Sequence, residues 1–230
     1  MADSTLLIQF AKSAVPGSVK TRLVPPLTTQ QAADLHTSMV VHTCATLCGA
    51  GLGEVQLWLS GEQQQPLLQS CREVGNFSQR QQCRGDLGKK LAHAVQAGLS
   101  HSERVIVVGS DAPAIDAAYL HAADRALDTT DVVLGPAWDG GYVLLGLKRF
   151  ARHLFMGIEW GTDSVLEDTL QRVEELAWSC SLLAELRDID RPEDLRFVPD
   201  SLSLQPAGQA QAERLASRLA SFAAAPGLAR

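Results

Sequence analysis

The strongest constraint on the fold comes from two apolar runs that each end in a glycine-bearing loop with an aspartate. Residues 105–108 (Val-Ile-Val-Val) lead into Gly109-Ser110-Asp111-Ala112-Pro113, and residues 132–134 (Val-Val-Leu) lead into residues 135–142, which contain Asp139. Short β-branched runs bounded by turn residues are typical of strands buried on both faces of a parallel sheet. Open α/β sheets bind ligands at the carboxyl ends of their strands. We therefore predict that Asp111 and Asp139 face one pocket.

Strand and helix patterns alternate through most of the chain. Apolar strand patterns occur near residues 6–10, 55–59, 77–83, 105–108, 132–134 and 142–147. Helical patterns lie between them, and Thr28 with Gln31 makes a capping box at the start of the first helix. The alternation predicts a three-layer α/β/α domain with a mostly parallel central sheet.

The chain divides near residue 198. A length of 230 residues suits one domain or a domain with an appendage, and residues 1–198 carry all of the alternating pattern. Residues 199–209 are rich in Pro, Ser and Gln and predict a linker. An Ala-rich helical pattern follows within residues 199–230 and predicts a C-terminal helix. This helix packs either on the domain or on a partner subunit, and in the second case the protein is an oligomer.

Composition excludes several classes of protein. A net charge of −6 argues against a general nucleic-acid binder, which needs a basic face. Five cysteines without a Cys-x-x-Cys pair suggest reduced thiols. No apolar segment reaches the roughly 18–20 residues that span a bilayer. These observations predict a cytoplasmic protein without a membrane span.

The loop after the first strand is locally basic. Residues 4–33 contain no Asp or Glu but hold Lys12, Lys20 and Arg22. The loop is not a P-loop, because Val19 replaces the glycine before the lysine, and no GxGxxG follows the strand. Its cations and backbone N–H groups predict phosphate binding. The alternative is a solvated surface loop.

An ordered set of motifs resembles one family. Phe10-Ala11-Lys12, residues 16–23 (Pro-Gly-Ser-Val-Lys-Thr-Arg-Leu), residues 85–88 (Gly-Asp-Leu-Gly), residues 109–113, residues 135–142 and Asp188-Ile189-Asp190 occur in that family's order. Together they are similar to a bacterial family of GT-A-type transferases associated with radical-SAM/selenodomain proteins or with arsenosugar biosynthesis. The resemblance covers residues 6–197. The chain departs from the family where Ala14 replaces a common Pro and Lys90 replaces an Arg.

The resemblance implies a nucleotide-diphospho-sugar transferase fold with a nucleotide at the carboxyl ends of the first strands. It implies nucleotide and phosphate contacts from Phe10, Ala11, Lys12, Gly17, Lys20, Arg22, Gln82, Gly85, Asp86 and Ser110. It implies an acceptor pocket formed by Trp138, Gly140, Gly141 and Tyr142. For Trp138, core packing is the alternative interpretation.

Four aspartates carry the predicted chemistry. Asp111 is the main candidate to bind Mg²⁺ or Mn²⁺ with the diphosphate, and its alternative role is to cap the following helix. Asp139 could be a second metal ligand, an acceptor anchor or a general base, and its alternative is turn formation with Gly140. Asp190, with Asp188, could add a carboxylate to the metal site, or these residues could cap the turn at residues 193–195.

Three functions remain open from the sequence. The first is metal-dependent glycosyl transfer from a nucleotide sugar to a small-molecule acceptor, which the resemblance and residues 135–142 favour. The second is nucleotidyl transfer from an NTP to a phosphorylated or carboxylated acceptor. It is favoured by the metal motif, which here holds a single Asp where the GT-A relatives have Asp-x-Asp. The third is nucleotide binding without catalysis.

Overall fold

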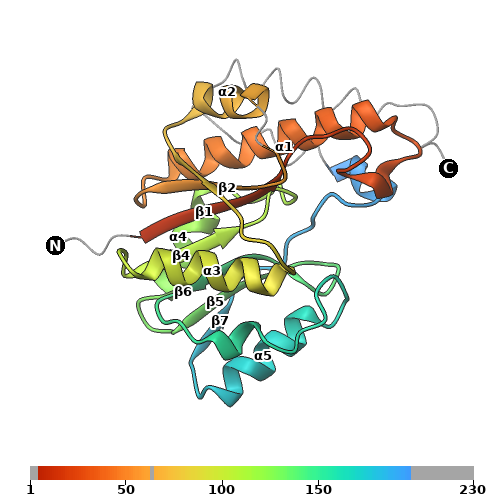
Figure 1. The fold of residues 1–230 in the computed structure, drawn as a ribbon. Coiled ribbons are helices and arrows are strands. Elements are labelled where there is room, and N and C mark those ends of the chain that lie inside the picture. The colour runs from red at the N-terminus through yellow and green to blue at the C-terminus, as the bar shows by residue number, and fades with distance from the viewer. Residues whose placement is uncertain (1–4, 63–64, 198–230) are drawn as a thin grey trace.

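The described part of the chain, residues 5–62 and 65–197 of the computed structural model, forms a seven-stranded sheet with helices on both faces (Figure 1). The strands are β1 (Thr5–Lys12), β2 (Val55–Ser60), β3 (Ser78–Gln81), β4 (Arg104–Val108), β5 (Val132–Pro136), β6 (Tyr142–Leu147) and β7 (Cys180–Leu182). The α-helices are α1 (Thr29–Ala50), α2 (Gln65–Val74), α3 (Leu87–Leu99), α4 (Ala117–Ala126) and α5 (Val165–Glu175). The predicted linker and C-terminal helix at residues 199–230 lie outside the described residues.

The strand order is β3-β2-β1-β4-β6-β5-β7, and the sheet is mostly parallel. β1 runs parallel to both β2 and β4, whereas β6 lies antiparallel between β4 and β5. The order reverses between β1 and β4, where open α/β sheets place their ligand crevice. The carboxyl ends of β1, β4 and β5 all lie at one edge, because β4 and β5 are both antiparallel to β6. The predicted α/β fold is confirmed.

One face of the sheet packs against α1, α2 and α4. The Thr28 hydroxyl accepts a hydrogen bond from the Gln31 amide while the Gln31 side chain accepts from the Thr28 amide, so the predicted capping box is present. α1 ends at Gly51, whose φ of 68° suits glycine. Leu47 from α1 and Leu120 from α4 join Ile106 and Val133 of the sheet in one buried cluster. This packing holds the loops after β1 and β4 on a rigid base.

The opposite face packs against α3, the short helix η2 (Arg152–Phe155) and α5. Leu91 and Val95 of α3 and Phe155 of η2 lie in one buried cluster with Ile8 and Val107 of the sheet. In Figure 1, α3 crosses in front of the strands and α5 lies below it. Within the described residues, no helix is both long enough and apolar enough to cross a membrane.

Candidate active site at the carboxyl edge of the sheet

Buried polar contacts join the ends of β1 and β4. The Ser110 hydroxyl donates to the Phe10 carbonyl at 2.9 Å, and the Gln9 side-chain amide donates to the Ser110 hydroxyl at 3.0 Å. The same amide donates to the Val40 carbonyl of α1 at 2.9 Å. Ser110 is 3% exposed. Its predicted phosphate-binding hydroxyl is therefore used inside the fold, where it joins the carboxyl ends of β1 and β4.

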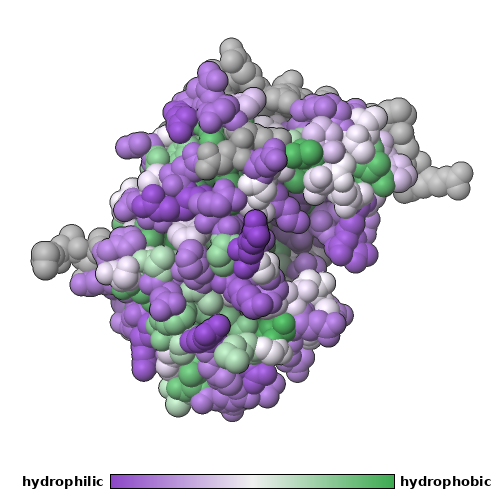
Figure 2. Space-filling model, viewed as in Figure 1, coloured by the Kyte–Doolittle hydropathy of each residue, from purple (hydrophilic) through white to green (hydrophobic). Residues whose placement is uncertain are grey.

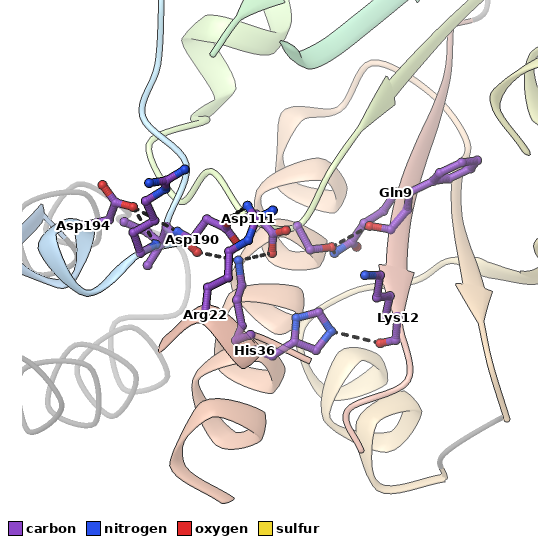
Figure 3. A network of polar contacts seen from close by, with 12 residues as sticks. Gln9, Lys12, Arg22, His36, Asp111, Asp190 and Asp194 are labelled. Carbon is purple, nitrogen blue, oxygen red and sulfur yellow. Dashed lines mark hydrogen bonds and ion pairs between the residues drawn. The ribbon is translucent and has the colours of Figure 1, made fainter. Parts of the chain in front are cut away.

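Lys20 and Asp111 form the central ion pair of the site (Figure 3). The Lys20 ammonium lies 2.8 Å from Asp111 Oδ1 and also donates to the Ile189 carbonyl. The Lys20 side chain is 3% exposed and that of Asp111 is 51% exposed. The Ile189 amide donates to the Asp111 carbonyl at 2.8 Å. Lys20 thus ties the loop after β1 to the loop after β4 and to residues 188–190.

Asp111 is held in its charged form. Enclosure by the surrounding loops disfavours the charge, but the Lys20 ammonium outweighs this effect and holds the pKa of Asp111 below its ordinary value. The capping alternative for Asp111 is wrong, because Asp116 caps α4 by accepting from the Tyr119 amide at 2.8 Å. One half-exposed carboxylate is therefore free of helix capping at the end of β4.

A second ion pair joins Arg22 to Asp190 at 2.6 Å. The hydrogen bond to Asp190 and its charge raise the pKa of Arg22. The turn after Asp190 is capped by Asp194, which accepts from the Asp190 and Arg191 amides. The capping role thus belongs to Asp194, whereas Asp190 is paired with a cation predicted to bind phosphate.

A cavity of about 260 Å³ opens beside these ion pairs. Asp111, Asp139 and Asp188 line it, together with Gly141 and Tyr142 of the predicted acceptor pocket. The prediction that the loops after β4 and β5 share a pocket is confirmed by this lining. Its walls include no Lys or Arg among the described residues. The pocket therefore concentrates negative charge.

Two predicted acceptor residues lie beside this cavity without lining it. Trp138 is 60% exposed, and the Arg187 guanidinium lies 3.8 Å from its ring centroid. The core-packing alternative for Trp138 is therefore wrong. Gly140 has a φ of +86°, and a Cβ there would lie 2.1 Å from the Asp163 carbonyl oxygen. Gly140 thus shapes the turn that presents Asp139.

Asp139 takes part in this turn and also faces the pocket. Its Oδ1 accepts a hydrogen bond from the Gly141 amide at 2.9 Å, as the turn alternative predicts. Burial, followed by the charge of Asp139, raises the pKa of the neighbouring Asp188 to about 6. Burial and the neighbouring carboxylates together outweigh the positive charge of Lys20, which acts to lower the pKa of Asp188. Within residues 5–62 and 65–197, no three acidic, His or Cys side chains form a metal cage.

The remaining predicted nucleotide residues surround the end of β1. The Lys12 side chain is exposed, and its carbonyl contacts His36 Nε2 at 3.0 Å. The Gln82 side-chain amide donates to the Ala11 and Trp58 carbonyls. Gly17 lies in an exposed turn with a φ of 81°. The segment from Lys12 to Arg22 therefore follows the carboxyl end of β1 and meets the loop after β4 through Lys20.

Residues 85 and 86 begin α3. Gly85 has a φ of 127°, and the Asp86 carboxylate accepts from the Lys89 amide at 2.8 Å as the N-cap. These positions shape the turn into the helix, and their predicted contact with a nucleotide base remains a prediction.

Comparison with known proteins identifies the family. The family model described as "Uncharacterized protein conserved in bacteria (DUF2064)" matches residues 43–162, which is 120 of the 230 residues. The chain belongs to the DUF2064 family. No curated protein sequence matches the chain.

Solved structures resemble the chain beyond the residues that the DUF2064 family model matches. A protein from Desulfovibrio desulfuricans, provisionally described as a nucleotide-diphospho-sugar transferase, is 23% identical with a TM-score of 0.79, covering 96% of this chain and 99% of that one. The 4-diphosphocytidyl-2C-methyl-D-erythritol synthase of Anaerococcus prevotii is 12% identical with a TM-score of 0.58, covering 85% and 96%. A cytidylyltransferase from Leptospira borgpetersenii is 13% identical with a TM-score of 0.55, covering 96% and 97%. The chain therefore has the nucleotide-diphospho-sugar transferase fold.

Sequence reasoning missed several residues of the pocket. Trp160, Gly161 and Thr162 line it from the segment before α5, and Val165 lines it from the first residue of that helix. The only sequence signal there is a Trp-Gly pair ahead of a helical pattern, which is common outside active sites. Asp188 was considered only as a partner of Asp190, yet it is Asp188 that lines the pocket.

His42 holds the loop after β4 against α1, and we expect it to make folding sensitive to mild acid. Its Nε2 lies 3.0 Å from the Pro113 carbonyl oxygen, so the neutral ring must carry its proton there. Burial lowers the pKa of His42, although this hydrogen bond opposes the change. The unfolded chain then takes up the proton first, so stability is full above about pH 6.5 and falls below it. The loss is roughly 1.4 kcal/mol for each pH unit by which the two pKa values differ.

Urea unfolding between about pH 5 and pH 7.5 tests this expectation. His42→Gln should flatten the decline. The remaining slope should combine a loss from His36, whose pKa burial also lowers, with an opposing gain from Asp188, whose pKa is raised to about 6. His101→Gln, at an exposed histidine, is the matched control. Equal slopes in wild type and His42→Gln would contradict the assignment.

Proposed function

We propose that this protein is a transferase that uses a nucleotide-activated donor, with the diphosphate bound in the crevice between β1 and β4. The observation that carries this proposal is the placement of Asp111 at the end of β4, opposite a loop that bears Lys12, Lys20 and Arg22. Phosphates need cations and backbone donors, and a carboxylate beside them suits a bridging metal. The exposed Lys12 ammonium can bind a phosphate without losing an ion pair to another described residue.

The residues present fit a divalent metal. Mg²⁺ or Mn²⁺ on a diphosphate needs only one or two carboxylates, with phosphate oxygens and water completing the shell. Asp111 would hold it, and Asp188 or Asp190 would be the second ligand. When bound, the metal would neutralise charge developing on the leaving diphosphate. The carboxylate-lined pocket, with the raised pKa of Asp188, is a setting in which a cation is favourable.

The pocket chemistry favours glycosyl transfer. An anionic nucleophile would be repelled by Asp111, Asp139 and Asp188, whereas a neutral hydroxyl could donate to one of them. In the proposed step, the acceptor oxygen forms a bond to the anomeric carbon while the bond from that carbon to the diphosphate oxygen breaks. Asp139 accepts the hydroxyl proton, and the nucleoside diphosphate leaves with the bonding electron pair.

Nucleotidyl transfer is the second candidate. Its supporting observation is that the loop after β4 carries one aspartate followed by Ala112 and Pro113, rather than the Asp-x-Asp of many glycosyltransferases. In this reaction a phosphate or carboxylate oxygen of the acceptor would attack the α-phosphorus of an NTP, and pyrophosphate would leave. The association with radical-SAM/selenodomain proteins or arsenosugar biosynthesis stays a prediction from resemblance, and a cytoplasmic location stays a prediction from composition.

Thermal unfolding with a panel of nucleoside diphosphates, triphosphates and nucleotide sugars, with and without Mn²⁺, tests the proposal. A ligand at 100 times its dissociation constant stabilises the fold by about 2.7 kcal/mol. We expect metal-dependent stabilisation by one diphosphate and its sugar conjugate. Stabilisation by a triphosphate alone would favour nucleotidyl transfer. No response to any nucleotide at millimolar concentration would overturn the proposed nucleotide site.

A further inference from the structure

A second, larger cavity adjoins the carboxylate-lined pocket. It has a volume of about 720 Å³ and lies between α3 and the segment from Phe150 to Trp160. We call it the α3 groove. Trp160 lines both the groove and the pocket, and its ring makes an edge contact with Tyr142 at a centroid distance of 6.4 Å. The two cavities are therefore neighbours across one indole ring.

The α3 groove has the opposite charge to the pocket. Arg84, Lys89 and Arg152 line it, against the single carboxylate of Asp86. Asp86 is already engaged, since it caps α3 and lies 3.7 Å from the Lys89 ammonium. Among the described residues, no ion pair or hydrogen bond engages the guanidinium of Arg84 or Arg152. Two free arginines thus lie in one groove of a protein whose net charge is −6.

The groove also offers an apolar floor. Phe150, Phe155 and Ile158 contribute to its lining, as does Met156, which is 54% exposed. Figure 2 shows hydrophobic patches beside strongly hydrophilic side chains on the face that carries α3 and α5. Guanidinium groups bind phosphate and carboxylate through two parallel hydrogen bonds, and adjacent apolar surface accommodates a carbon chain or ring. This combination suits an organic anion better than an inorganic ion.

We propose that the α3 groove binds the anionic end of the acceptor, whose neutral hydroxyl enters the pocket beside Asp139. This inference rests on the proposed function and adds the acceptor's chemical class, an elongated organic phosphate or carboxylate with a free hydroxyl. The charges orient such a molecule, because the pocket repels the end that the groove attracts. Trp160 forms the wall along which the middle of the acceptor passes.

A titration followed by the indole N–H signals of the four tryptophans tests the groove directly. The probes are phenyl phosphate and benzoate as anions and phenol as the neutral control, and Trp160→Phe identifies the Trp160 signal. We expect at least one anion to shift that signal at concentrations where phenol and the Trp178 signal show no change. In Arg84→Gln/Arg152→Gln, the dissociation constant should rise at least about tenfold, because two charge-assisted contacts are lost.

The matched control is Arg80→Gln/Arg125→Gln, which removes the same charge from two exposed positions outside the groove. It should leave the dissociation constant within about twofold, as expected for screened surface charges. Phenol binding as tightly as the anions, or equal weakening by both double variants, would overturn the proposal. Nucleotide-induced stabilisation should survive in Arg84→Gln/Arg152→Gln, and its loss would assign the groove to the nucleotide instead. If anions bind in the groove but no nucleotide stabilises the wild type, the proposed function fails and the groove remains an anion site.

Discussion

Replacing Asp111 by Asn is expected to abolish turnover and to destabilise the fold as well. The proposed metal-binding charge disappears, and a charge-stabilising group of this kind contributes several kcal/mol to the transition state, so activity should fall at least about a thousandfold. The same change leaves the Lys20 ammonium, whose side chain is only 3% exposed, without its counter-charge. The product to measure is the nucleoside diphosphate released from the donor that the thermal scan identifies.

The stability loss follows from the unequal exposure of the two partners. Breaking a fully buried ion pair costs roughly 3–5 kcal/mol, because the surviving charge stays desolvated. Asp111 is half exposed and Asn keeps an oxygen for Lys20 to donate to, so we expect a smaller loss of about 2 kcal/mol, below that range. Urea unfolding at neutral pH without metal measures it.

Lys20→Met provides the matched comparison. It should cost less stability than Asp111→Asn, because the Asp111 carboxylate left behind can be hydrated. Backbone strain does not change the comparison, because Met and Lys are equally strained at the φ of 49° that residue 20 adopts. Lys20→Met/Asp111→Asn should be no less stable than Asp111→Asn alone, since neither variant residue is charged. Additive losses would show that the pair is not coupled. Turnover should stay lost in the double variant even if its stability recovers, because it lacks both the proposed metal ligand Asp111 and the proposed phosphate contact Lys20.

The sequence predicted those parts of the site that depend on strand ends. Runs such as Val105–Val108 are recognisable because a strand buried on both faces leaves an uninterrupted apolar pattern. Parallel strands bring their following loops to one edge, so Asp111 and Asp139 could be assigned to one pocket without knowledge of the register. The capping box at Thr28 was equally predictable, because it depends on residues three apart.

The ion pairs could not be predicted in the same way. Lys20 meets Asp111 from a left-handed backbone conformation, which no local pattern around residue 20 indicates. From the sequence, these two residues had separate roles in phosphate and metal binding. The structure shows that the two side chains form an ion pair with each other. Arg22 and Asp190 repeat this arrangement across 168 residues of sequence separation.

Short edge elements and cavities between distant segments also escaped prediction. β7 has only three residues and pairs at the sheet edge with β5, so it lacks the length that makes a strand pattern visible. The α3 groove joins the start of α3 to residues 150–160, and its cations are scattered along the sequence. Only the packing of both segments on the same sheet face brings Arg84 and Arg152 together.

Asp139→Asn is expected to remove most of the activity while leaving the structure intact. Asn can still accept the hydrogen bond from the Gly141 amide, which in the native protein goes to Asp139 Oδ1 at 2.9 Å. An amide cannot take up the acceptor's proton, and loss of a general base typically costs about 10²–10⁴-fold in rate. The variant should also lower the pKa of Asp188, because the charge of Asp139 contributes to raising it.

Two further variants separate catalysis from turn formation. Asp139→Ala should lose the same activity and, in addition, about 1 kcal/mol of stability with the turn hydrogen bond. Asp163→Asn removes an equal charge from an exposed position whose backbone abuts Gly140, and it should keep near-native turnover.

If Asp139→Asn retains more than about a tenth of wild-type activity, the base lies elsewhere in the pocket. Asp188 would then be the residue to test, since its raised pKa of about 6 already suits a group that accepts a proton near neutral pH.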